Sequence, residues 1–376
     1  MGKTDVNVMT GTKVPALRFK GFNDEWVEKK LGDVLSYEQP TKYIVESDNY
    51  DDSNDIPVLT AGKSFVLGYT DEVDGVYDKG DVILFDDFTT ATQLVDFEFK
   101  VKSSAMKLLT PNNDGNINFM YELLNKVQYP HDDHKRYWIS EFATLKSNMP
   151  TKDVEQNQIG EVFKTVDALI QSDEQKLEQL QSLKKSFLQK MFPKKGATVP
   201  ELRFDGFSGD WAETQILDEI RAYQPKTLPQ SEFTGAGYPV YGANGIIGYT
   251  DKYNHDFEQI ALACRGTVGS VIRTEKKSWI NGNAMVLDVS DNDSVDFDFM
   301  YHLLGQYNFN RLATGSTQLQ ITRASLLGAK FYMPSLQEQQ AIGQFFKTFD
   351  ELIAKQEEKV ENGKLLKKAL LQKMFV

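Results

Sequence analysis

The sequence is poor in the residues that build disulfides, metal sites and membrane spans. Its 376 residues include one cysteine, Cys264, and four histidines. A single cysteine excludes an intrachain disulfide and favours a reducing compartment. No run of 18 apolar residues occurs, and the N-terminus has no apolar stretch that could serve as a signal peptide. We therefore expect a soluble, cytoplasmic protein with no membrane association.

Motifs for catalysis are equally scarce. Ala61-Gly62-Lys63-Ser64 resembles the end of a phosphate-binding loop, but Pro57 stands where the first glycine belongs, so a turn after a strand is favoured. No Gly-x-Gly-x-x-Gly follows a strand, and the Asn-Pro-Pro-aromatic quartet of amino-methyltransferases is absent. Cys264 has no nearby histidine to activate it as a nucleophile. These absences predict a chain that is not itself an enzyme.

One cluster has the side chains of a metal site. His131-Asp132-Asp133-His134 offers imidazole and carboxylate groups, but a protein metal site needs three or four ligands in a defined geometry. The other two histidines, His255 and His302, lie far away in the sequence without a matching pattern. A polar loop is favoured, and we expect no metal or cofactor in this chain.

The charge balance bears on nucleic-acid binding. The formal net charge is −12, whereas nucleic-acid-binding proteins usually have a basic face. Acidic stretches such as 48–55 and 288–298 can hold the surplus negative charge away from a basic cleft. The charge therefore weakens the case for DNA binding without excluding it.

Two long stretches have the 3-4-3-4 apolar spacing of a coiled-coil seam. Each predicts a single helix of roughly 57 Å, at about 1.5 Å per residue. A helix that long is not needed to close a small core and suggests a spacer. The expected seam residues are Ile159, Phe163, Val166, Ile170, Leu177, Leu180, Lys184 (the one polar break), Phe187 and Met191, and then Ile342, Phe346, Phe349, Ile353, Val360, Leu366, Leu370 and Met374.

The whole chain consists of two copies of one sequence unit. Val14–Phe22 recurs as Val199–Phe207, and the helical ends Leu188–Phe192 recur as Leu371–Phe375. Two copies are too few for a solenoid, so a duplicated globular part followed by a helix is predicted. We expect domains at 1–152 (with 1–12 disordered) and 194–336, and long helices at 153–193 and 337–376.

Each globular part has mostly strand signals. Short β-prone runs such as Val82–Phe85, Ala105–Leu109 and Asp256–Ala263 lie between Gly, Asn and Asp turns. Phe119–Lys126 and Phe299–Gln306 have the pattern of short amphipathic helices. The expected fold class is therefore α+β.

The copies agree in their helices and differ in their loops. Residues 85–91 stand where the second copy has 263–268, and 134–138 stand where it has 316–320. A shared scaffold with different polar loops is what a protein needs to hold two versions of one kind of target.

The loop side chains suit DNA. Arg, Gln and Asn contact base edges, while Ser, Thr and glycine amides contact phosphates. For Asp86-Asp87 a plain turn, a base-edge acceptor for cytosine and acid–base catalysis are the alternatives, with catalysis the least favoured. The candidate DNA-binding residues are Lys63, Asp86, Asp87, Phe88, Thr89, Thr90, Lys102, Ser103, His134, Lys135, Arg136, Tyr137, Asn244, Arg265, Gly266, Thr267, Arg311, Thr314, Gly315, Ser316, Thr317, Gln318 and Gln320.

The ordered set of motifs resembles the DNA-specificity (S) subunit of type I restriction–modification enzymes, over residues 14 to 376. Any one motif is weak, but the set occurs twice. The segments that carry the resemblance are Asp153–Ile159 and Pro334–Ile342 at the helix starts, Tyr241–Tyr249 and Thr314–Gln318 in the second copy, and Tyr37–Tyr43, Pro57–Lys63 and Phe85–Thr90 in the first.

The resemblance implies an architecture and a set of partners. Two target-recognition domains would lie at opposite ends of two antiparallel helices with pseudo-two-fold symmetry, and each domain would contact one half of a split double-stranded DNA site. Two methyltransferase subunits would dock on the helices, and two motor–nuclease subunits can join. S-adenosylmethionine, ATP and magnesium would belong to those partners. Within this scheme we expect Arg136 and Arg265 to contact bases or the DNA backbone.

Two other functions fit parts of the sequence. A coiled-coil scaffold that joins protein partners without DNA fits the acidic charge, but not the divergent polar loops. A stand-alone nuclease or methyltransferase needs a metal or cofactor site that the sequence does not offer. DNA binding in the presence of partners would separate the first alternative from a specificity subunit, and turnover by the isolated chain would support the second.

Overall fold

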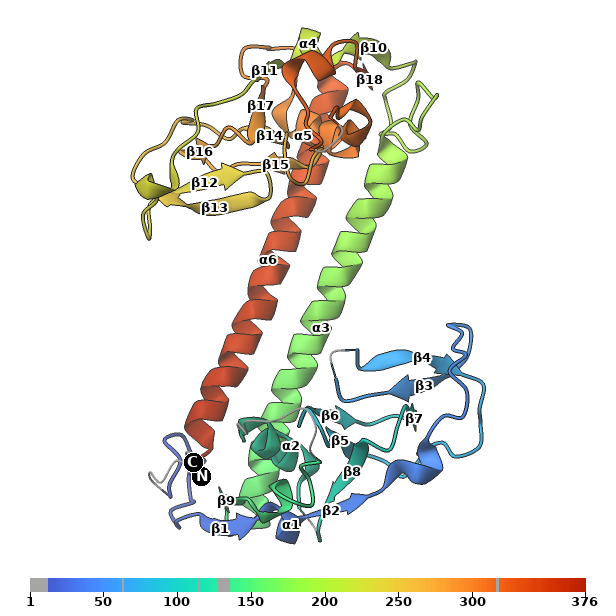
Figure 1. Ribbon diagram of the computed structural model, residues 1–376, viewed down its shortest axis with the longest axis vertical. Coiled ribbons are helices and arrows are strands. Elements are labelled where there is room, and N and C mark those ends of the chain that lie inside the picture. The colour runs from blue at the N-terminus through green and yellow to red at the C-terminus, as the bar shows by residue number, and fades with distance from the viewer. Residues whose placement is uncertain (1–12, 63, 114, 128–135, 316–317) are drawn as a thin grey trace. The chain divides into compact units, whose positions relative to one another are not determined.

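The computed structural model describes residues 13–62, 64–113, 115–127, 136–315 and 318–376. The chain forms two compact units (Figure 1). Unit 1 comprises the chain up to Glu174 together with Glu358–Val376, and unit 2 is the continuous stretch Gln175–Glu357. Each long helix therefore contributes one half to each unit.

The globular part of unit 1 is built from three small sheets. A four-stranded antiparallel sheet has the order β2-β8-β5-β6, a three-stranded sheet has the order β4-β3-β7 with β3 and β7 parallel, and β1 pairs with β9. The elements are β1 (Val27–Lys30), α1 (Leu31–Val34), β2 (Leu35–Glu38), a 3-10 turn (Pro40–Tyr43), β3 (Ile56–Leu59), β4 (Val66–Thr70), β5 (Val82–Asp86), β6 (Thr92–Val95), β7 (Lys100–Val101), β8 (Met106–Pro111), α2 (Ile117–Lys126), a 3-10 turn (Phe142–Thr144) and β9 (Lys146–Met149).

Among the described residues, unit 2 repeats the strands and α-helices of unit 1 in the same order and has one additional 3-10 turn. Its sheets have the orders β11-β17-β14-β15, β13-β12-β16 and β10-β18. The elements are β10 (Ala212–Gln215), α4 (Ile216–Glu219), β11 (Arg221–Tyr223), β12 (Tyr238–Gly242), β13 (Gly245–Thr250), β14 (Ile260–Ala263), β15 (Val271–Arg273), β16 (Trp279–Ile280), β17 (Ala284–Asp288), α5 (Phe297–Gln306) and β18 (Lys330–Met333), with 3-10 turns at Gln230–Glu232, Phe309–Leu312 and Arg323–Leu326. The predicted duplication and α+β class are confirmed. The strand expected at Asp256–Ala263 is shorter and begins at Ile260.

The run Val82–Phe85 explains why β5 is central. All four side chains are fully buried, because both faces of the sheet are covered. Ile83 and Phe85 face the core shared with α2 and the long helices, whereas Val82 and Leu84 face the core under the three-stranded sheet. A strand with two buried faces has a continuous apolar sequence instead of an alternating one.

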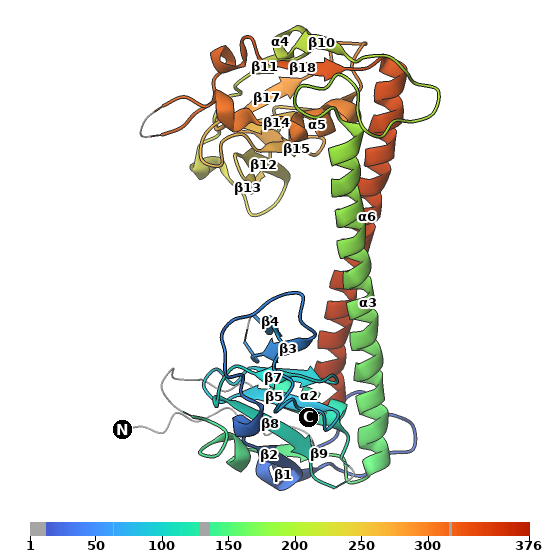
Figure 2. The ribbon, with the colours of Figure 1, turned by 90° about the vertical axis from the view of Figure 1, so that its right-hand side faces the viewer.

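The long helices are α3 (Asp153–Met191) and α6 (Leu336–Met374). In unit 1 the first half of α3 runs antiparallel to the second half of α6, with Lys367 paired to Asp167 and Lys364 to Glu174. In unit 2 the two helices also lie side by side (Figure 2), and Lys184 of α3 pairs with Asp350 of α6. Gln156 and Gln339, one turn into each helix, also donate to the carbonyls of the preceding Pro150 and Pro334.

The predicted seam is right except at one position. The expected α3 seam residues, Lys184 included, are all at least partly buried. On α6, however, Leu366 is 52% exposed, which corrects the prediction. Gly363 and Lys367 take its place, since 360, 363, 367, 370 and 374 keep the 3-4 spacing. A Cβ at Gly363 would meet Ile170 at 2.9 Å, so the helices are close there.

An aromatic residue just after each long helix closes each unit. Phe375 lies 5.1 Å from Phe119 and 5.7 Å from Phe163, ring centre to ring centre. At the equivalent position of unit 2, Phe192 lies 5.6 Å from Phe299 and 5.9 Å from Phe346. Each Leu-Gln-Lys-Met-Phe motif thus anchors the end of one long helix to the globular part that precedes the other long helix.

Candidate nucleic-acid interface

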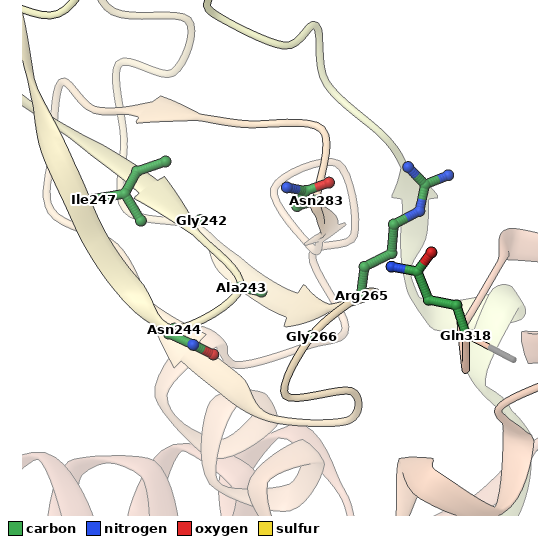
Figure 3. A pocket seen from close by; sticks show the side chains of 8 residues that line it. All are labelled: Gly242, Ala243, Asn244, Ile247, Arg265, Gly266, Asn283 and Gln318. Carbon is green, nitrogen blue, oxygen red and sulfur yellow. The ribbon is translucent and has the colours of Figure 1, made fainter. Parts of the chain in front are cut away.

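Four segments of unit 2 line a surface cavity of about 460 Å³ (Figure 3). They are the β12–β13 turn with Asn244, the turn 263–270 after β14 with Arg265, the residue Asn283 before β17, and the segment 307–329 between α5 and β18 with Gln318. We call 263–270 and its unit 1 counterpart 86–91 the post-strand turns, and 307–329 and 127–145 the post-helix segments.

Cys264 joins three of these segments through its backbone. Its N–H donates to the carbonyl of Asn283 at 3.0 Å, and its carbonyl accepts from the N–H of Ile321 at 3.1 Å. These bonds hold the post-strand turn between the β16–β17 loop and the post-helix segment. The cavity therefore lies where the central strand β14 ends and its neighbour β17 begins.

Arg265 is the only cationic residue that lines the cavity among the described residues. Its side chain is exposed, and the described part of the chain offers it no ion-pair partner. Gly266 follows with a φ of +79°, a backbone conformation that favours glycine. Thr267 is exposed in the same turn.

In the post-helix segment Gln318 lies close to an antiparallel bridge. Thr314 and Gln320 exchange two backbone hydrogen bonds of 2.9 Å. Gly315 has a φ of +116°, and a Cβ there would lie 2.3 Å from the carbonyl oxygen of Gln318, so only glycine fits. Arg311 lies outside the cavity lining, where it stacks on Tyr307 and donates to its hydroxyl at 2.7 Å. Ser316 and Thr317 lie outside the described residues.

Asp87 is the counterpart of Cys264 in unit 1. Its N–H donates to the carbonyl of Ala105 at 2.9 Å, and its carbonyl accepts from the N–H of Tyr137 at 2.9 Å. Tyr137 is thus equivalent to Ile321. The predicted match of the post-strand turns agrees with this, but the predicted match of 134–138 with 316–320 is wrong by two residues.

The structure removes Asp87 and Tyr137 from the candidate DNA contacts. Asp87 is buried, and its carboxylate accepts from the Trp138 N–H at 2.7 Å and lies 3.1 Å from Lys107 Nζ. Tyr137 is buried in the main core of unit 1. Both residues position the loops from inside, because their side chains do not reach the surface.

The remaining candidates of the first post-strand turn lie closer to the surface. Asp86 accepts from the N–H groups of Phe88 and Thr89, which ties its carboxylate into the turn. Thr90 has a φ of +60°. Arg136 is exposed, and its guanidinium carbon lies 5.8 Å from the centre of the Phe88 ring.

Two candidates on the β7–β8 loop are engaged locally. Lys102 pairs with Asp48 and lies over the Tyr50 ring, and its hydrogen bond to Asp48 raises the pKa of the lysine. Ser103 accepts from the N–H of Ala105. Lys63, His134 and Lys135 lie outside the described residues.

Several cavity residues were not predicted, namely Gly242, Ala243, Ile247 and Asn283. Asn283 had a usable signal. Lys102 and Ser103 made the β7–β8 loop of the first copy a candidate. The duplication places Asn283 in the corresponding loop of the second copy, at the position equivalent to Ala105.

Two kinds of reactive group can be placed among the described residues, the cysteine thiol and the potential metal ligands. Burial raises the pKa of the Cys264 thiol to about 11, so it stays protonated at neutral pH. Within residues 13–62, 64–113, 115–127, 136–315 and 318–376 no group of three potential metal ligands occurs.

No helix in these ranges is long and apolar enough to cross a membrane.

The model of one protein family matches both copies. The family is described as the type I restriction modification DNA specificity domain, and the match covers residues 23–182 and 209–362. The chain belongs to this family. Its two matches coincide with the duplicated halves, each including a recognition domain and part of a long helix.

Relatives agree over most of the chain. The chain is 29% identical over 361 residues to the type I restriction enzyme EcoR124I/EcoR124II specificity subunit of Escherichia coli, with 88% of each chain covered. It is 23% identical to the MjaVIII specificity subunit of Methanocaldococcus jannaschii, with 95% and 92% covered. The crystal structure of the S subunit of a type I restriction–modification system from M. genitalium superimposes with a TM-score of 0.77 at 16% identity, over 96% of this chain and 99% of the other. The protein is therefore a non-catalytic specificity subunit that recognises DNA, and the scaffold and stand-alone enzyme alternatives are set aside.

Proposed function

We propose that the recognition domain of unit 1 contacts one half of a bipartite asymmetric DNA site and that of unit 2 contacts the other. The observation that carries this is the pairing of one topology with two sets of loop side chains. Phe88 and Arg136 stand in unit 1 where unit 2 has Arg265 and Gln320. Different side chains on one scaffold contact different base sequences, so the site would be asymmetric.

We further propose that two methyltransferase subunits dock on the outer faces of the long helices, and that two motor–nuclease subunits can join. The seam side chains pack within each unit, so docking falls to outward residues. Leu169 and Leu352 are equivalent and 61% and 45% exposed, and Leu183 and Leu366 are equivalent and 48% and 52% exposed. Large exposed apolar side chains at repeated positions favour contact with two copies of one partner.

In this scheme the chemistry lies in the partners. S-adenosylmethionine, ATP and Mg²⁺ would be bound by the methyltransferase and motor subunits, and the complex would act on cytoplasmic DNA. This chain would supply only the choice of sequence and the docking surface. The acidic net charge fits a subunit whose partners contribute much of the phosphate contact.

The experiment is co-production with type I methyltransferase subunits, followed by sequencing of modified adenines in the host genome. A single two-part asymmetric motif is the expected result. Absence of a complex, or a complex that methylates without a motif, would contradict the proposal.

A further inference from the structure

We infer that each recognition domain places one guanidinium group at the same topological position to contact a guanine, and that the two domains deliver it from different loops. Arg265 comes from the post-strand turn of unit 2, and Arg136 comes from the post-helix segment of unit 1. The inference rests on the proposed half-site function and adds the base and the residue that contacts it.

The backbone bonds around Asp87 and Cys264 establish the equivalence. Arg265 directly follows Cys264, and Phe88 directly follows Asp87, so Arg265 and Phe88 are counterparts. Arg136 directly precedes Tyr137, and its guanidinium carbon lies 5.8 Å from the Phe88 ring centre. The unit 1 guanidinium therefore stands beside the position from which Arg265 projects in unit 2.

Both guanidinium groups are available to a ligand. Arg18, Arg203, Arg221 and Arg273 all form ion pairs with carboxylates, and Arg311 is bonded to Tyr307. In the described ranges Arg136 and Arg265 have no such ion pair. Among the described residues neither guanidinium has a salt bridge to break on approach to DNA, and the cation–π contact of Arg136 with the Phe88 ring engages the face of the guanidinium instead of its N–H groups.

The surroundings of Arg265 favour a base over a phosphate. Carboxamides line the same cavity, from Asn244, Asn283 and Gln318, and lysine is absent from its described lining. Asn and Gln form paired hydrogen bonds with adenine, and the Arg fork matches O6 and N7 of guanine. Phosphate sites rely more on lysine, hydroxyl and backbone N–H donors. The cavity thus has the donors and acceptors of a base-contacting surface.

Arg323 provides a matched control. It is the remaining arginine of the chain, it is exposed, and it lies two residues after Ile321 in the same post-helix segment. It does not line the cavity. Arg323→Gln therefore shows the effect of losing one positive charge near the cavity, and this effect can be separated from the loss of the Arg265 guanidinium inside it.

The test compares wild type with Arg265→Gln, Arg136→Gln and Arg323→Gln, each as the full chain in complex with the methyltransferase subunits. Modified-adenine sequencing and methylation of duplexes with single base changes give the preference at every position. Arg265→Gln should lower discrimination at one G·C pair of one half-site by on the order of 10- to 100-fold. Arg136→Gln should do the same in the other half-site, and Arg323→Gln should change neither.

The outcomes separate the inference from the proposed function. The Arg265→Gln and Arg136→Gln complexes could bind every duplex more weakly while keeping all base preferences. If the salt dependence of their DNA binding also fell by about one phosphate contact, the arginines would be assigned to the DNA backbone and the inference would be overturned. Relaxation at an A·T pair would overturn it as well. In both cases the half-site function would stand. A wild-type complex without any motif would remove the proposed function itself.

Discussion

Asp87 and Cys264 occupy the same position in the two recognition domains, yet one is a carboxylate and the other a thiol. Their backbones make the same two bonds, to Ala105 and Tyr137 in unit 1 and to Asn283 and Ile321 in unit 2. The strand pairing Phe85–Lys107 corresponds to Leu262–Met285. The buried ion pair Asp87–Lys107 of one domain is therefore a Cys264–Met285 pair in the other.

The first prediction follows from this exchange. Lys107→Met leaves the Asp87 carboxylate buried without its cation, and we expect unit 1 to lose about 3–5 kcal/mol of unfolding free energy. Adding Asp87→Cys should recover a large part, because the double variant copies the apolar pair of unit 2. Urea unfolding followed by tryptophan fluorescence measures both, with Trp138 beside the site. Equal losses in the single and double variants would contradict the expected recovery.

The second prediction concerns the ion pair at the start of each long helix. Arg203 makes two hydrogen bonds of 2.7 and 2.6 Å to Glu338, which is 1% exposed, and Arg18 does the same with Glu155. Arg203→Met should cost unit 2 about 3–5 kcal/mol. Lys194→Ala, which breaks an exposed pair with Glu201, is the control and should cost less than about 1 kcal/mol in the same urea titration. A similar small loss for both variants would rule out a structural role for Arg203.

The third prediction is a pH dependence that resides in unit 1. Burial raises the pKa of Glu122 to about 7, although Lys367 Nζ lies 2.7 Å from its carboxylate and opposes the shift; Asp167, which shares that lysine, adds to it. Because the folded pKa exceeds the ordinary value of 4.5, the folded state binds more protons between these pH values, and stability should fall as pH rises from about 4.5 to about 7. The fall should be at most about 3 kcal/mol.

Glu122→Gln tests this dependence. The variant should match wild type near the lower limit of this window and be more stable above pH 7, as measured by urea unfolding at a series of pH values. His302 holds the equivalent position in unit 2, next to Asp350, and is unchanged in the variant. A wild-type protein that gains stability relative to Glu122→Gln over this range would contradict the assignment.

The fourth prediction concerns the packed helices. Phe346 is fully buried and contacts Phe192, Phe345 and His302, so Phe346→Asp should abolish the folding of unit 2 or its assembly with the methyltransferase. Circular dichroism and co-elution on size exclusion measure the two effects. The control Lys195→Glu alters an exposed position outside both long helices and should leave both unchanged. A Phe346→Asp protein that folds and assembles normally would refute the packed seam.

The sequence was sufficient where a pattern repeats along the chain. The duplication, the two long helices and most of the seam depend on periodic apolar positions, which tertiary context does not alter. Leu366 was misplaced because leucine is a better seam residue than lysine by hydrophobicity alone. Lys367 occupies the seam instead because Glu122 and Asp167, distant in sequence, supply its partners.

The candidate site was less accessible to sequence reasoning. Asp87 looked like a surface acceptor, since aspartate in a polar loop is usually exposed. Its burial depends on Lys107, twenty residues on, and on the Trp138 N–H, and neither contact follows from local sequence. The predicted alignment of the two post-helix segments was wrong by two residues because these loops differ in their side chains. They have no repeating apolar pattern by which the two copies could be aligned. Only the backbone bonds of Tyr137 and Ile321 give their true match.

The composition of the two units has a consequence for synthesis on the ribosome. Unit 2 is one continuous stretch, but the core of unit 1 includes Met374 and Phe375, and the Leu17 N–H donates to the carbonyl of Lys373. The ribosome therefore completes Gln175–Glu357 before it synthesises Glu358–Val376, the C-terminal segment of unit 1. The domain that is translated first is thus the one whose core closes last, and a truncated chain presents a finished second domain beside an unfinished first one.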